Sequence, residues 1–447
     1  MTKSKLKYEH IFIICMIVLF GIFLFFCRSI NAPSQRTIHD NIISIKPFVD
    51  MIVLFDEGFT PTPNPYFNTD NNILSSYSNL SPPISYLISW ILFKDISPLF
   101  FDGDLKTISL TKNYYYAWNF LRYSSLGIIV TTVFVFMMSL LLLFQLSNMK
   151  TGSPIIKFLT IFALSTSCIF IFTFTNANPL MLTAAFMAFF VANYNSDNKT
   201  MRELSYVSLA LAASIKITPA FMGILLLFNK QWSASIKVAI YSVLLIFVPF
   251  FFIDSSLGIS GSEGGIISNF IAGVSQWIKI LSSYGDGAMS FPVWIGGFDK
   301  TFTIIMNKWI YVGCIISSLL AIATAPFLKK EDEWKKVFLM MLAMLLIHKG
   351  AKFQHYLLFL FPCIIMFLNA NLKVNFKNTL YLISILLILN PVQVGKFRGI
   401  VTVSVYLIKF GFLSLFAHLL YDSISNFIRS RTLSKEGTRQ IPAAKHM

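Results

Sequence analysis

Polar side chains that could bind a phosphate group interrupt the apolar runs of this sequence at a few positions. Asn176 and Asn178 stand just before Pro179, and Lys216 lies in the stretch SIKITP. The stretch HKGAKFQHY supplies two histidines and two lysines, which are His348, Lys349, Lys352 and His355. Lysine and histidine donate charge-assisted hydrogen bonds to phosphate oxygens. This mixture is typical of a site for an anionic lipid headgroup and a polar acceptor.

Carboxylates that could accept the proton of an attacking hydroxyl group lie mainly in a long polar segment near the start of the chain. Asp40 and Asp50 both belong to the stretch HDNIISIKPFVD, and the pair Asp56 and Glu57 follows it. Asp286, in the stretch YGDG, is a further candidate for contact with the substrate. Simpler interpretations remain open for these residues, because Asp40 suits a solvated loop and Asp286 suits a turn.

The other candidates also have structural alternatives. Lys216 stands close to Pro219 and could extend its ammonium group from a helix end toward water. His355 could be a hydrogen-bonded histidine inside a helical bundle. Asn176 and Asn178 could cap a helix that begins at Pro179. The sequence alone leaves these alternatives beside the functional interpretation.

The sequence lacks the motifs by which enzymes bind nucleotides or zinc. It contains no GxxxxGK[ST] phosphate loop, no HExxH pair and no GxSxG turn. An activated group must therefore arrive on another carrier, and a donor embedded in the membrane is the natural candidate. No metal or other cofactor is predicted. The one alternative is a divalent cation at Asp102 and Asp104, on either side of a glycine.

Membrane helices are the elements that must position these residues. Of 447 residues, 55% are hydrophobic and only 13% are charged, and the mean hydropathy is +0.68. Apolar runs recur from Ile11 to near Tyr421, which excludes both a soluble protein and a soluble enzyme with a single anchor. The net charge of +16 comes from lysines and arginines in short linkers, so it predicts no nucleic-acid partner. We expect an all-α, polytopic helical bundle surrounded by membrane lipids.

About twelve transmembrane helices are expected, give or take two. They cover about 11–30, 124–146, 155–174, 178–194, 204–217, 218–229, 235–254, 302–326, 336–349, 352–369, 378–394 and 401–421. With a cytoplasmic amino terminus, the basic linkers all fall on the inside, as the positive-inside rule requires. We therefore expect a multi-pass protein of the inner (cytoplasmic) membrane, with its acidic residues concentrated outside.

One domain is expected over residues 1–430, with outer loops at 31–122 and 255–300 and a polar cytoplasmic tail at 431–447. A rival layout makes 82–101 a transmembrane helix and joins 204–228 into one helix. That layout places Lys216 near the centre of the bilayer, at a cost of about 2.5–3.5 kcal/mol. The twelve-helix layout is therefore preferred.

Several stretches resemble the core pattern of glycosyltransferase family 87, a bacterial family of the GT-C superfamily. The specific ones are NANPLMLTAAFMAFFVANY and YVSLALAASIKITPAFMGILLLFNKQW, in which a helix of small residues ends in Lys-x-x-Pro. HKGAKFQHYLLFLFPCII is similar to a later segment of that family, and NPY at 64–66 and NLSPPISYLI at 79–88 are similar to the ends of its first outer loop. The resemblance covers roughly residues 30–370.

The resemblance implies a membrane enzyme that transfers a hexose, commonly mannose, from a polyprenyl-phosphate donor to a lipid or glycan acceptor outside the cytoplasm, with inversion. The superfamily places an essential aspartate in the first outer loop. By position that residue is Asp40, with Asp50 second and the Asp56 and Glu57 pair third. Lys216, Lys352 and His355 would hold the donor phosphate. The residues expected to contact the substrates are Asn176, Asn178, His348 and Asp286.

Alternative functions remain open at this stage. A polysaccharide polymerase or ligase would also carry large outer loops, but it would consume a lipid diphosphate oligosaccharide. A secondary transporter typically shows internal repeats and mid-membrane polar sites, whereas no repeat is visible here and the polar groups gather at one face. A purely structural role would leave Lys216 and the aspartate-rich loop without a purpose.

Overall fold

The computed structural model describes residues 7–29, 125–175, 177–256, 271, 274, 303–347, 353–370, 372–390 and 400–439. Within these ranges the chain forms thirteen α-helices, joined by turns and short 3₁₀ helices, and no residue there lies in a β-strand. The all-α prediction is therefore confirmed for this part of the chain. The outer loop 31–122 lies outside it, as does nearly all of the loop 255–300.

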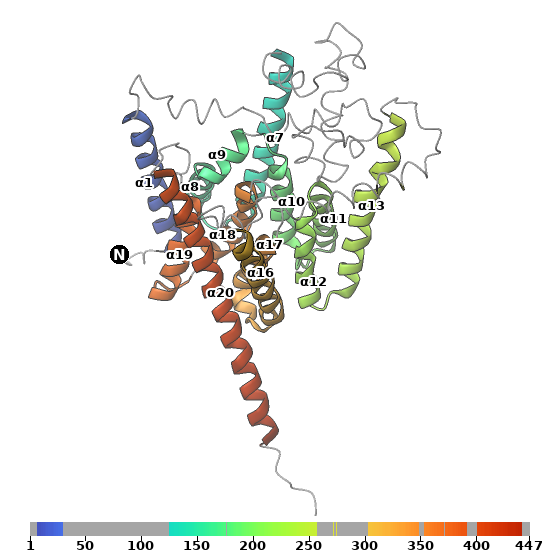
Figure 1. The fold of residues 1–447 in the computed structure, drawn as a ribbon, viewed down its shortest axis with the longest axis vertical. Helices are drawn as coiled ribbons and strands as arrows, with labels where there is room; N and C mark the ends of the chain where they lie inside the picture. The colour runs from blue at the N-terminus through green and yellow to red at the C-terminus, as the bar shows by residue number, and fades with distance from the viewer. Residues whose placement is uncertain are drawn as a thin grey trace, which may run out of the picture.

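The helices follow the expected apolar segments (Figure 1). They are α1 (Tyr8–Ser29), α7 (Ser125–Met149), α8 (Pro154–Ser165), α9 (Cys168–Thr175), α10 (Leu180–Asn193), α11 (Lys199–Ile215), α12 (Ile224–Phe228), α13 (Trp232–Ser256), α16 (Thr303–Thr324), α17 (Glu333–Ile347), α18 (Leu360–Asn369), α19 (Phe376–Leu389) and α20 (Ile400–Arg439). The 3₁₀ helices Thr218–Gly223 and Phe353–Phe359 lead directly into α12 and α18. Each expected segment falls on one helix or on two consecutive helices.

Far fewer of these helices are long enough to cross a bilayer unaided. The described residues contain three such spans, Gly127–Met149, Trp309–Phe327 and Tyr406–Thr432. A fourth results if α8 and α9, which are bent by 65° at their junction, are counted together. The expected twelve spans are therefore not confirmed. Many of the apolar helices have only 10–17 residues, whereas a straight crossing needs about 20.

The helices α10 and α11 form an antiparallel hairpin. The Ser208 hydroxyl on α11 donates to the carbonyl of Phe186 on α10 at 3.0 Å. At the lower end in Figure 1, the side-chain oxygen of Asn195 accepts from the amides of Asn229 and Gln231, which joins this hairpin to the turn between α12 and α13. These hydrogen bonds hold α10, α11 and the turn between α12 and α13 in one compact unit.

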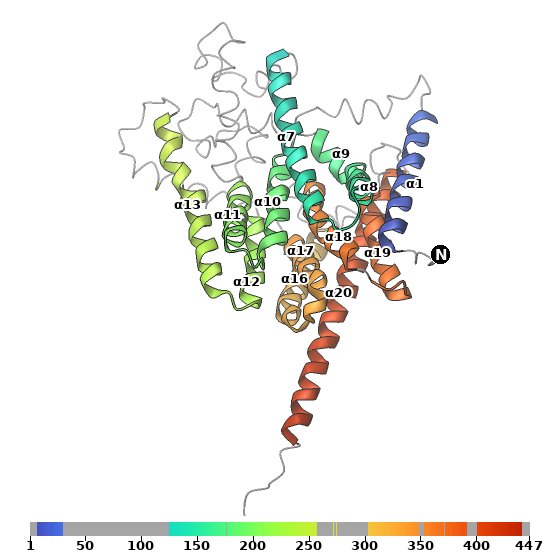
Figure 2. The same cartoon turned by 180° about the vertical axis from the view of Figure 1, so that it is seen from behind.

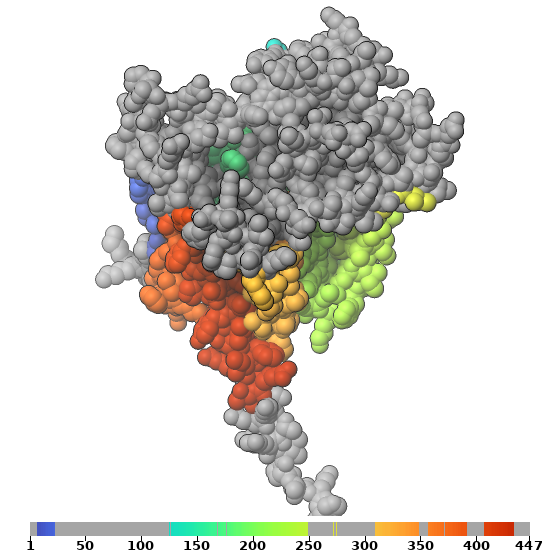
Figure 3. Space-filling view, in the orientation of Figure 1, coloured from blue at the N-terminus to red at the C-terminus, as the bar shows by residue number. Residues whose placement is uncertain are grey.

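Charged residues gather at this lower end, which we call the charged end. Every ion pair found among the described residues lies there, namely Lys150–Glu9, Lys237–Glu203, Lys335–Asp332, Lys335–Asp422, Lys336–Glu333 and Lys377–Asp422. The helix α20 continues past the expected boundary at residue 421 to Arg439 and projects below the bundle there (Figure 3). The first part of the expected tail therefore belongs to the last helix.

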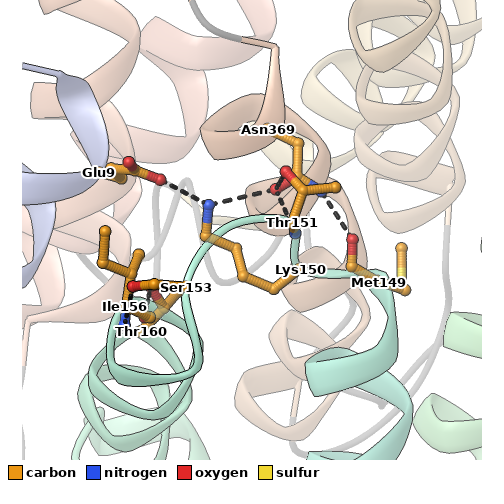
Figure 4. Close-up of polar contacts among 8 residues, drawn as sticks. All are labelled: Glu9, Met149, Lys150, Thr151, Ser153, Ile156, Thr160 and Asn369. Carbon is orange, nitrogen blue, oxygen red and sulfur yellow. Dashed lines mark hydrogen bonds and ion pairs between the residues drawn. The ribbon is translucent and has the colours of Figure 1, made fainter.

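Three segments far apart in sequence meet in one buried polar cluster at the charged end (Figure 4). The Lys150 ammonium group binds the Glu9 carboxylate at 2.8 Å and the Asn369 side-chain oxygen at 3.2 Å. The amide of Asn369 also donates to the carbonyl of Met149 at 2.7 Å. Since the Lys150 side chain is only 1% exposed, its charge depends on Glu9 for compensation. The cluster fixes α1, the α7–α8 turn and the end of α18 against one another.

The outer surface of the bundle exposes large apolar side chains, whereas a surface that faces water would carry polar groups. On α7 one face is exposed by 46–60% and consists of Ile129, Val133, Phe136, Leu140 and Phe144. The opposite face, with Val135, Met138 and Leu142, is at most 2% exposed. Since both faces are apolar, the helix packs against protein on one side and suits lipid on the other. This arrangement supports a membrane protein.

Removing one member of the buried Glu9–Lys150 pair is expected to destabilise the protein. Glu9→Gln or Lys150→Met leaves the other charge buried and uncompensated, which costs about 3–5 kcal/mol. The double substitution should recover most of that loss. Thermal unfolding of the purified protein in detergent measures the effect. Glu203→Gln, in the half-exposed Lys237–Glu203 pair, is the control and should cost no more than about 1 kcal/mol. If the Glu9→Gln variant unfolded at the same temperature as the wild-type protein, the prediction would be contradicted.

Candidate functional site

The turn between α9 and α10 has a conformation that the NANP stretch explains. The backbone N–H of Asn178 donates to the carbonyl of Thr173, and that of Ala177 donates to the carbonyl of Phe174. These two bonds define a Schellman motif, in which the residue after the cap adopts the left-handed conformation. Ala177 takes that position with φ of 52° and is fully buried. A helix stop followed by Pro179 reverses the chain within four residues.

Asn178 caps α10 from this turn. Its side-chain oxygen accepts the N–H of Leu180 at 2.9 Å, and its carbonyl accepts the N–H of Met181 at 3.1 Å. The next two N–H groups, of Leu182 and Thr183, donate to the carbonyl of Pro179. All four N–H groups of the first turn are therefore used by the chain itself. The amino end of α10 therefore offers no free backbone N–H group to an anionic ligand, and such a ligand would need cationic side chains.

Lys216 occupies the corresponding position at the end of α11. Its backbone is extended, with φ of −144° and ψ of 127°, and its N–H still bonds to the carbonyl of Ala212. The 3₁₀ helix Thr218–Gly223 then begins, with Pro219 in its first turn, and the chain runs back as α12. Proline cannot donate the next helical hydrogen bond, which explains the break. The part of the rival layout that joins 204–228 into one helix is therefore wrong, whereas its other part, a helix over 82–101, lies outside the described residues.

Asn178 and Lys216 lie at nearly the same height in the bundle. The Ser208–Phe186 hydrogen bond marks one level of the antiparallel α10–α11 hairpin. Asn178 lies eight residues from Phe186, and Lys216 lies eight residues from Ser208 in the same direction along the bundle. Because helices rise by equal steps, the two residues reach a common level. We use the name central helix ends for Thr175, Leu180, Ile215 and Ile347 with the turns attached to them.

α17 reaches the same level from the charged end. The Tyr194 hydroxyl, just after α10, donates to the Glu333 carboxylate at the start of α17. Burial, together with that carboxylate, raises the pKa of Tyr194 well above its ordinary value, so the hydroxyl keeps its proton. Both helices then run fourteen residues from this contact, to Leu180 and to Ile347. The upper part of α17 touches both long 3₁₀ helices, Thr218–Gly223 and Phe353–Phe359.

The segment Phe353–Phe359 closes this arrangement because it packs against α9, α10 and α17. It also contains Tyr356, which is 6% exposed and meets Phe359 edge to face with ring centroids 5.8 Å apart. Runs of 3₁₀ helix longer than three or four residues are uncommon. The described residues contain two such runs, of six and seven residues, and both lie at the central helix ends. Sequence reasoning did not predict this conformation.

The structure places three of the predicted site residues. Asn178 is buried in the cap of α10, Lys216 is partly exposed at the end of α11, and the backbone of His355 lies in the 3₁₀ helix Phe353–Phe359. Their segments come together at the central helix ends. The other predicted residues lie outside the described part of the chain, namely Asp40, Asp50, Asn176, Asp286, His348 and Lys352.

Two lysines with described side chains, Lys216 and Lys409, lie away from the charged end. The Lys335–Asp422 ion pair places Lys409, thirteen residues along α20 from Asp422, about level with the end of α17. A cation at the carboxyl end of a helix is favoured by the helix dipole. Within the same residues, no cluster of three His, Cys, Asp or Glu side chains could hold a metal ion. Lys216 therefore places a cationic residue at the central helix ends.

The fold and this site define an integral membrane protein of helices that carries a cation-bearing polar site between its central helices. The sequence profile of glycosyltransferase family 87 matches residues 117–348, which is more than half of the chain. The protein therefore belongs to glycosyltransferase family 87, and it is a membrane glycosyltransferase with a sugar donor and an acceptor. No curated protein and no solved structure matches the chain.

The extent of the family match separates the predicted residues into two groups. Asn176, Asn178, Lys216, Asp286 and His348 lie within it, and so do the helices from α7 to α17. The remaining candidates are outside it, and they are Asp40, Asp50, Lys352 and His355. The family match thus includes α10, α11 and α17, whose ends form most of the central helix ends.

The left-handed Ala177 leads to a prediction about the α9–α10 turn. Ala177→Val should destabilise the protein by about 1–3 kcal/mol, because a β-branched side chain is strained at this φ. Ala177→Gly should be tolerated, since glycine adopts this conformation without strain and loses only one methyl group. Thermal unfolding and glycosyl transfer are measured for both variants. Equal stability of the two would show that the turn is not left-handed.

Proposed function

We propose that this enzyme has the GT-C type of fold and moves a hexose, mannose, from a polyprenyl phosphate to a glycolipid or glycan acceptor. The observation that supports the proposal most directly is the placement of Lys216 beside the segments of Asn178 and His355, at the level opposite the charged end. A lipid-borne donor can reach that level from the surrounding bilayer. A lipid monophosphate carries one strongly anionic group, and a lysine suits it.

In the proposed reaction, the acceptor hydroxyl attacks the anomeric carbon of the sugar as its bond to the phosphate oxygen breaks. Asp40, or Asp50 in second place, takes the proton of that hydroxyl. A positioned base of this kind contributes typically 10²–10⁴-fold. The sugar is transferred with inversion, because only one displacement occurs. The lipid monophosphate leaves with the electron pair of the broken bond.

Cations carry the other half of the chemistry. Lys216, Lys352 and His355 would stabilise the charge that grows on the leaving phosphate. The residues proposed to hold the sugar and the acceptor are Asn176, Asn178, His348 and Asp286. Asn178 would contribute to this site while its side-chain oxygen accepts the N–H of Leu180. No metal ion is required by this scheme.

The orientation of the proposed enzyme follows from its charge distribution. The ion pairs and most described lysines lie at one end, and Lys7 immediately precedes α1 at that end. The positive-inside rule assigns such an end to the cytoplasm. We therefore place the enzyme in the inner membrane, with its amino terminus in the cytoplasm and its reaction on the outer face.

Asp40→Asn and Lys216→Ala should each reduce sugar transfer by about 10²–10³-fold while the protein still inserts. Membranes are incubated with radiolabelled polyprenyl-phosphate mannose, glucose or arabinose, and the loss of label from the lipid is measured. Lys329→Ala, which removes an exposed lysine at the charged end, should retain full activity. Unchanged transfer in both site variants would remove the proposed site. Consumption of a lipid diphosphate oligosaccharide alone would indicate a polymerase or ligase.

Cysteine labelling tests the orientation separately. In a protein without native cysteines, Asp40→Cys and Asp286→Cys should react with an impermeant maleimide applied to the outside of intact cells. Lys329→Cys and Arg431→Cys, at exposed positions of the charged end, should react only after the cells are opened. Labelling of both pairs from the same side would contradict the proposed topology.

A further inference from the structure

A buried hydroxyl group on α7 has no hydrogen-bond partner. Thr131 is 0% exposed, and its Oγ1 is one of four such buried atoms among the described side chains. The others are Nδ1 of His10 and Nε1 of Trp334, at the charged end, and Oγ of Ser242, which lies about level with Ser208. Leaving a buried polar group unpaired is costly, so each case needs a physical explanation.

The usual solution for such a hydroxyl is absent at Thr131. Many buried Thr and Ser residues elsewhere in the described helices donate to the carbonyl three or four residues earlier. Thr160 does so at 2.8 Å, Thr173 at 2.7 Å, and Ser139, eight residues below Thr131 on α7, at 2.8 Å. The side chain of Thr131 thus departs from the local pattern of its own helix.

Thr131 faces the interior of the bundle. It belongs to the buried face of α7, in register with Val135, Met138 and Leu142, and not to the lipid-facing side. The lower part of this face packs on α10, where the Ser139 hydroxyl contacts the sulfur of Met181 at 3.2 Å. The hydroxyl of Thr131 therefore points toward protein or ligand and away from the bilayer.

Its height places Thr131 beyond the central helix ends. The Ser139–Met181 contact puts Met138 level with Leu180, where α10 begins. Thr131 lies seven residues farther along α7, or about 10 Å at 1.5 Å per residue. Figures 1 and 2 show α7 and α13 rising past the upper ends of α10 and α11. Thr131 is thus on the wall of α7 above the level of Lys216.

We propose that Thr131 binds a hydroxyl group of the donor's sugar, an inference that rests on the proposed function. A phosphate at Lys216 has its lipid tail in the bilayer, and the sugar extends from the phosphate toward the outer face. A neutral hydroxyl suits a sugar hydroxyl, since each can donate and accept one hydrogen bond. The substrate would then supply the missing partner. Thr131 would be a substrate-binding residue that the protein leaves unsatisfied until the sugar arrives.

Binding measurements with two lipids test this inference. Purified protein is titrated with polyprenyl-phosphate mannose and, separately, with sugar-free polyprenyl phosphate. Thr131→Val should raise the Kd of the mannose lipid about tenfold, equal to about 1.4 kcal/mol, and leave that of the sugar-free lipid unchanged. Thr131→Ser should restore binding. Thr160→Val makes the same chemical change at a buried hydroxyl that is already bonded, and it should affect neither Kd.

Stability provides an independent readout. Since Thr131 makes no hydrogen bond in the protein, Thr131→Val should unfold at the wild-type temperature or above it. A clear loss of stability would show a structural bond and overturn the inference. An equal loss of affinity for both lipids, or no loss for either, would also overturn it. If wild-type protein binds the mannose lipid but transfers nothing, the proposed reaction fails while Thr131 can still be judged. If it binds neither lipid, the proposed donor fails and this inference with it.

Discussion

Backbone hydrogen bonds in a bilayer must be satisfied within the protein, and this constraint shapes every turn of the structure. The bundle breaks its helices close to the proposed site, where an unpaired N–H or C=O group would be costly. The α9–α10 turn solves the problem with a Schellman motif and the Asn178 cap. The α12–α13 turn repeats the motif, with Lys230 in the left-handed position at φ of 58° and Gln231 bonded to the carbonyl of Leu226. In both of these turns, two of the N–H groups that follow the helix are bonded to carbonyls of its last turn.

The same constraint explains why the polar site and the fold are difficult to separate. Side-chain atoms that could bind a ligand are partly used to close helix ends, as the oxygen of Asn178 shows. Lys216 shows the same overlap, because its backbone N–H completes α11 while its side chain is a proposed ligand of the donor phosphate. A membrane enzyme of this kind concentrates its chemistry at helix interruptions, where polar residues are needed in any case.

Much of the fold was predictable from the sequence. The apolar runs located the helices, and Pro179 and Pro219 located two of the breaks, because proline cannot continue a helix. The pairing of Glu9 with Lys150 was not predictable, since 141 residues separate them and Lys150 reads as an ordinary linker cation. The inward orientation of Thr131 was also not predictable from the sequence. The stretch VTTV contains two threonines, and only the packing of α7 decides that Thr131 faces inward. The proposed base, Asp40 or Asp50, remains a sequence prediction.

The short central helices have a consequence for the choice of acceptor. α10 has fourteen residues and is about 21 Å long, whereas the hydrocarbon layer is about 30 Å thick. In the proposed orientation, α10 does not cross this layer by itself, and its start with Asn178 and Lys216 lies below the upper ends of α7 and α13. Under the proposed function, a site recessed in this way favours slender acceptors, such as a single glycan chain end or a sugar carried on its own lipid, over a folded protein domain.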